Sequence, residues 1–112
     1  ILEIIGPPSQ AKLAIDADQN WIAYITRQDQ LLLKRFSIHP GRVYGEMAGN
    51  SVSIWYFHDR CCEIEPIGPW DRIDPGKSLA FRESWWLMDH AYPHDRRVDL
   101  PELKRRIEDM QQ

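Results

Sequence analysis

The sequence lacks most of the features that assign a function directly. It has no apolar run near the roughly 20 residues that span a bilayer. It has no basic excess either, since 14 Lys and Arg residues stand against 17 Asp and Glu residues. A protein that binds a phosphate backbone usually carries a basic face, so we expect no membrane and no nucleic-acid partner. No Gly-x-Ser-x-Gly elbow, phosphate-binding glycine loop or dinucleotide fingerprint occurs, and we expect no cofactor.

Cysteine is scarce as well. The two cysteines, Cys61 and Cys62, are adjacent. Neighbouring residues of a strand point to opposite faces, so a bond between them is not expected. Two unpaired thiols favour a reducing compartment slightly, which indicates the cytoplasm.

The rest of the composition is that of one folded domain, residues 1–112, with 43% hydrophobic and 28% charged residues. Alternating, β-branched and aromatic stretches between turn residues predict strands. We place them at 11–15, 20–26, 31–38, 51–58, 61–67 and 77–88. Short turns between successive strands are typical of antiparallel pairing. The sequence therefore predicts an all-β antiparallel sandwich over residues 1–97.

The last segment, residues 98–112, predicts a short amphipathic helix. Asp99 stands at an N-cap position with Glu102 three residues later, and Val98 and Leu103 occupy the positions of a hydrophobic staple. An apolar stripe recurs at helical spacing: Leu103, Ile107 and Met110. We expect this stripe to pack on its own sheet, with a partner surface as the alternative.

Glu63 and Glu65 are the first candidates for a functional site. They lie two residues apart on an expected strand, so both project from one face while Cys62 and Ile64 project from the other. Neighbouring carboxylates raise each other's pKa, and such a pair can act as a general base, a cation ligand or an acceptor for sugar hydroxyls. The alternative is the solvent-facing side of a half-buried strand.

Glu83 shares a face with Trp85 and other apolar residues of the last strand. A carboxylate among apolar neighbours needs a partner. We expect a structural ion pair, with Arg72 or Arg82 nearby in the sequence, although Arg82 should face the other way. The alternative is that Glu83 binds a ligand. Trp85 and Trp86 must point to opposite faces of a regular strand, so at least one is expected to meet solvent, a subunit or a ligand.

The remaining candidates are aromatic and histidine residues. Trp55 and Trp85 are candidates for stacking on a sugar ring, although most tryptophans in a small β domain belong to its core. His58, at a strand end, is a candidate acid–base group or a surface turn residue. His90 and His94 lie four residues apart, but Pro93 argues against a helix that would align them, and we expect no metal site.

The segment from 61 to 87 resembles uncharacterised DUF4380-type members of the galactose mutarotase-like "supersandwich" superfamily. The motifs that carry the resemblance stand in this order: Glu63-Ile64-Glu65, Gly68-Pro69, Ile73 before Pro75-Gly76, and Glu83-Ser84-Trp85-Trp86-Leu87. Trp21-Ile22-Ala23-Tyr24 followed by Leu33-Lys34-Arg35-Phe36 also resembles a hairpin of such proteins. The resemblance covers roughly residues 11–88.

The resemblance implies a carbohydrate-active domain with a small saccharide as ligand, and an activity like that of aldose 1-epimerases. It implies Glu65 as the base for ring opening, or Glu63 in a shifted register. Ile67 replaces the glutamine of the epimerases, and the segment from Glu65 to Gly76 is shorter. Full sandwiches are more than twice as long, so the chain is expected to be the C-terminal part of a longer protein. The alternative is a non-catalytic sandwich that binds saccharide, forms a homodimer or packs against a missing N-terminal half.

Overall fold

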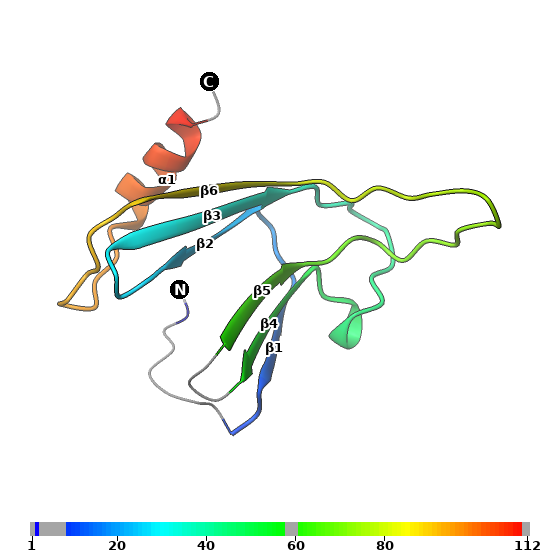
Figure 1. The fold of residues 1–112 in the computed structure, drawn as a ribbon, viewed down its shortest axis with the longest axis horizontal. Helices are drawn as coiled ribbons and strands as arrows, with labels where there is room; N and C mark the ends of the chain where they lie inside the picture. The colour runs from blue at the N-terminus through cyan, green and yellow to red at the C-terminus, as the bar shows by residue number, and fades with distance from the viewer. Residues whose placement is uncertain (1, 3–8, 58–60, 111–112) are drawn as a thin grey trace.

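The computed structural model describes residues 2, 9–57 and 61–110. In chain order the elements are β1 (Lys12–Ile15), β2 (Trp21–Ile25), β3 (Gln30–Phe36), η1 (Met47–Gly49), β4 (Val52–Phe57), β5 (Cys61–Pro66), β6 (Glu83–Asp89) and α1 (Leu100–Asp109). The strands form two antiparallel sheets, ordered β1–β4–β5 and β2–β3–β6 (Figure 1). The fold is all-β and sandwich-like with a short C-terminal helix, as the sequence predicts.

The β2–β3 hairpin organises the second sheet. Its turn closes with the Thr26 N–H donating to the Gln30 carbonyl at 2.8 Å, and Asp29 adopts a φ of 57°. Aspartate tolerates this left-handed conformation better than most residues. Asp29 also accepts hydrogen bonds from the main-chain N–H groups of His90 and Tyr92, at 2.9 and 2.8 Å. The turn therefore anchors the chain where it leaves β6.

The main core lies between this sheet and α1. Leu31 and Leu33 of β3 are fully buried against Leu103 and Ile107 of the helix. Residues of the three strands pack around them on the same face: Trp21, Ala23, Ile25, Trp86 and Met88. Figure 1 shows α1 lying against the end of the sheet where β6 finishes.

The helix begins as the sequence predicts. The Asp99 carboxylate accepts a hydrogen bond from the Glu102 N–H at 3.0 Å and caps the first turn. Val98 packs on the same cluster as the buried Leu103. The predicted stripe faces the sheet, since Leu103 and Ile107 are buried and Met110 packs beside them. The prediction that the helix packs on its own sheet is confirmed.

The opposite face of the β2–β3–β6 sheet turns toward the β1–β4–β5 sheet. The Lys34 ammonium of β3 donates to the Ile64 carbonyl of β5 at 2.6 Å. Burial raises the pKa of Tyr24 on β2, and the neighbouring Cys62 and Tyr56 of the other sheet add to this rise. The Lys34 hydrogen bond and the proximity of Tyr24 to Cys62 and Tyr56 indicate which faces of the two sheets are turned toward each other.

The last strand begins later than predicted. Residues 77–82 are not a strand, and β6 starts at Glu83. The register explains the difference, because β6 pairs only with β3, and its first pair joins Glu83 to Phe36, the last residue of β3. Residues 67–82, which we call the arm, run outward from β5 and return to β6 (Figure 1). Residues 70–80 of the arm are all exposed.

Candidate functional site

Glu63 and Glu65 lie on the outer face of the β1–β4–β5 sheet, away from the other sheet. Their predicted sharing of a face is confirmed, since Cys62 lies on the side that meets Tyr24. Glu63 pairs with Trp55, which pairs in turn with Lys12, so these three residues form one row across the sheet. Glu63 is exposed and Glu65 is half-buried.

The row that contains Glu65 is less exposed than the row of Glu63. Its neighbour in the register, Ser53, is fully buried, and Ser53 Oγ has no hydrogen-bond partner among the described residues. The more accessible part of the outer face is therefore the end that carries Glu63.

Lys12 gives this face a positive charge that the sequence reading missed. Its ammonium lies 2.7 Å from the Glu46 carboxylate. That hydrogen bond is the main cause of a raised Lys12 pKa, and the charges of Glu46, Glu65 and Glu63 add to it. The alternation of Lys12 with Leu13 on a short strand was the available signal, because it places a charged side chain on the outer face.

Two aromatic rings complete the accessible part of the outer face. Trp55 and Phe57, two residues apart on β4, stack with ring centroids 5.4 Å apart and planes inclined by 19°. Trp55 is half-buried and Phe57 is exposed. We call Lys12, Trp55, Phe57 and Glu63 the aromatic strip. His58, the predicted acid–base candidate, lies outside the described residues.

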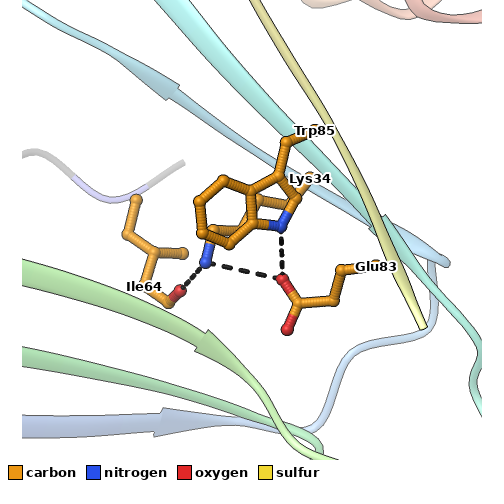
Figure 2. Close-up of polar contacts among 4 residues, drawn as sticks. All are labelled: Lys34, Ile64, Glu83 and Trp85. Atoms are coloured by element: carbon orange, nitrogen blue, oxygen red, sulfur yellow. Dashed lines mark hydrogen bonds and ion pairs between the residues drawn. The ribbon is translucent and has the colours of Figure 1, made fainter. Parts of the chain in front are cut away.

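Glu83 and Trp85 form a second group, on the inner face of the β2–β3–β6 sheet (Figure 2). The Trp85 indole N–H donates to Glu83 Oε2 at 2.6 Å, and Lys34 Nζ lies 3.6 Å from the same oxygen. Lys34 Nζ also lies 4.1 Å from the centroid of the Trp85 ring. Ring, ammonium and carboxylate therefore hold one another in place.

The partner of Glu83 is a correction to the sequence prediction. The expected ion pair forms with Lys34, whereas Arg72 pairs with Asp74 in the arm. The register brings Lys34 directly opposite Trp85 and diagonal to Glu83. A lysine directly after three leucines in β3 was the signal in the sequence. Its partner depends on pairing between distant segments.

The candidates do not converge on one site. The Glu63 group and the Glu83 group lie on opposite sides of the β1–β4–β5 sheet. Two hollows occur elsewhere among the described residues, with volumes of about 430 and 170 Å³. The first is lined by Asp18, Gln19, Asn20, Phe36, Ser37, Ile38 and Pro40. The second is lined by His90, Ala91, Pro93, Arg97, Val98, Asp99, Glu102 and Leu103. Neither includes a predicted site residue.

The histidines and thiols of the described segments have other surroundings. His90 Nδ1 lies 2.9 Å from an Arg106 nitrogen, and His94 meets the Tyr92 ring edge-on. Over residues 9–57 and 61–110, no cluster of three or more His, Cys, Asp or Glu side chains is placed to bind a metal. Cys61 and Cys62 are unbonded to each other.

Comparisons with protein-family models, with curated proteins and with solved structures found no match. In the described part of the chain, no helix is long and apolar enough to cross a membrane.

Proposed function

We propose that this chain is a non-catalytic β-sandwich module that works by packing against another protein surface. The observation that carries the proposal is the exposure of Trp85 and Leu87, at 62% and 65%, on the face of β6 that carries Glu83. The β1–β4–β5 sheet leaves these side chains uncovered. Burying either would stabilise a complex by about 1.5–3 kcal/mol.

The accessible surface supports a module that is completed by a partner. The chain exposes 8523 Å². A compact protein of 13.2 kDa exposes about 6,400 Å². Arm side chains such as Trp70, Ile73 and Leu79 are also exposed. These exposed apolar side chains are candidates for contact with a partner.

Two substitutions test whether the β6 face is an interface or a core. In Leu87→Lys, we expect the free energy of unfolding to stay within about 1 kcal/mol of wild type, because the side chain is already exposed. In Leu33→Ala, we expect a loss of about 2–5 kcal/mol, because a fully buried side chain leaves a cavity. Urea unfolding of highly diluted protein measures both.

The same experiment includes a binding readout. At high dilution the wild-type chain should bind an apolar fluorescent dye, and Leu87→Lys should bind less. If Leu87→Lys unfolds the chain, the β6 face belongs to the core and the proposal fails. Absence of dye binding by the folded wild type would also contradict it.

A second candidate is saccharide binding at the aromatic strip. The observation that favours it is the stacked pair of Trp55 and Phe57 beside Glu63 and Lys12. Apolar ring faces can stack on a sugar while the flanking charges bind its hydroxyls. The epimerase activity implied by the resemblance remains a further prediction. Its expected base, Glu65, is half-buried and lines neither of the two hollows.

Titration with hexoses and short oligosaccharides, followed by tryptophan fluorescence, tests the second candidate. We expect Phe57→Ala and Glu63→Gln each to weaken binding roughly fivefold or more, since each removes about 1 kcal/mol of contact. Trp70→Ala in the arm is the control and should bind as wild type does. A wild-type spectrum that no sugar changes would rule out this function.

A further inference from the structure

The β6 strand has an unpaired main-chain edge in addition to its exposed side chains. It is the last strand in the order β2–β3–β6. The His90 N–H donates to the Asp29 carbonyl just beyond β6, so even-numbered residues point their main-chain groups toward β3 and odd-numbered ones point away. Glu83, Trp85 and Leu87 thus present outward N–H and carbonyl groups.

One end of this edge is already occupied. The Arg106 side chain of α1 donates to the carbonyl of Asp89 at 3.2 Å. Asp89 is an odd-numbered residue, so this contact agrees with the alternation. The helix therefore covers the edge at Asp89. From Glu83 to Leu87, the outward N–H and carbonyl groups have no main-chain partner among the described residues.

From this edge we infer that a second copy of the chain pairs with β6, antiparallel and centred on Trp85, and this inference rests on the proposed packing function. In that register Glu83 of one copy meets Leu87 of the other, and the two Trp85 residues face each other across a two-fold axis. Each outward residue then exchanges both main-chain hydrogen bonds with an outward residue. The two sheets become one continuous sheet of six strands, and the edge is closed.

The side chains favour a second copy as the occupant. Trp85 is already oriented by Glu83 and Lys34 (Figure 2), so little rotamer freedom is lost when two of these rings meet. Leu87 of the second copy covers the ion pair between Glu83 and Lys34 and excludes water from it. The same alternating pattern serves both copies, as a two-fold interface requires.

The exposed side chains leave room for an interface of this kind. The 8523 Å² of accessible surface exceeds that of a compact monomer by roughly 2,000 Å². The exposed arm residues 70–80 contribute part of this excess and stay outside the interface. Trp85 and Leu87, exposed at 62% and 65%, are the apolar side chains that pairing through β6 would cover.

Sedimentation equilibrium of the wild type and three variants tests the inference. We expect a wild-type dimer. Leu87→Pro removes an outward N–H without breaking the pairing to β3, and Leu87→Lys places a charge on the edge. Each should weaken dimerisation roughly tenfold to a hundredfold, because the symmetry doubles every loss. Leu79→Lys, a similarly exposed leucine in the arm, should leave the dimer unchanged.

A cross-link tests the register. In a Cys61→Ser, Cys62→Ser background, Ser84→Cys should be joined to its counterpart by a short bismaleimide, because pairing centred on Trp85 brings the two positions to roughly 8 Å. Circular dichroism checks the fold of every variant. If Leu87→Pro does not fold, Leu87→Lys and the cross-link still decide.

The outcomes separate the two proposals. A wild type that stays monomeric, or a dimer that both Leu87 variants leave intact, overturns pairing through β6. If the monomeric wild type binds the apolar dye through Leu87, the packing function stands with a different partner. Unfolding of Leu87→Lys would overturn the packing function itself.

Discussion

At the residue scale, Lys34 joins the two sheets. It follows three leucines in β3, and its ammonium contacts the Ile64 carbonyl, the Glu83 carboxylate and the face of Trp85. A nearly buried ammonium is costly unless its donors are satisfied. These three contacts satisfy it, and they determine how Trp85 is presented.

Replacement of this lysine by an apolar chain should therefore be costly. We expect Lys34→Met to lower the free energy of unfolding by about 1–3 kcal/mol, because the Ile64 carbonyl and Glu83 lose their charged partner. Denaturant unfolding measures the loss. Lys77→Met, at an exposed lysine in the arm, should change stability by less than about 0.5 kcal/mol. Equal effects of the two substitutions would show that Lys34 does not join the sheets.

At the element scale, α1 provides much of the core. Its stripe of Leu103 and Ile107 covers the buried Leu31 and Leu33 of β3. An isolated helix of this length is marginal in water, so the helix depends on both its cap and its sheet. The cap, in turn, contributes to the core of the β2–β3–β6 sheet.

Loss of the cap should accordingly weaken the whole sheet. We expect Asp99→Ala to cost about 1 kcal/mol, because the Glu102 N–H loses its acceptor and a negative charge leaves the helix N-terminus. Thermal unfolding followed by circular dichroism measures the change. Asp109→Ala, at the opposite end of α1, is the matched control and should be neutral or slightly stabilising. A neutral Asp99→Ala would contradict this role.

At the scale of the whole molecule, the two sheets form an open sandwich. The Cα radius of gyration is 15.7 Å. A compact domain of this length has about 13 Å. The arm, which runs away from both sheets in Figure 1, contributes to the extended shape. A second chain along β6 would extend one sheet and bury exposed apolar side chains.

Several elements followed from local sequence patterns. Asp99, Glu102 and the stripe of α1 are read from neighbours within three or four positions, and the structure confirms them. The predicted start of β6, at residue 77, lies six residues before the observed start at Glu83. The aromatic and apolar residues of 77–88 begin before the point where β3 offers a partner. A strand ends where its neighbour ends, which local composition does not encode.

The features of the candidate site also fall into local ones, which the sequence predicts, and those set by tertiary contacts. The sequence alone determined that Glu63 and Glu65 share a face and that Trp85 and Trp86 oppose each other, because the two-residue period of a strand is local. Only the tertiary structure decided that Lys34 pairs with Glu83 and that β6 is an edge strand. It also decided that Glu63 and Glu83 lie on opposite sides of the β1–β4–β5 sheet. Those features depend on register and sheet order, which arise from contacts between residues far apart in the chain.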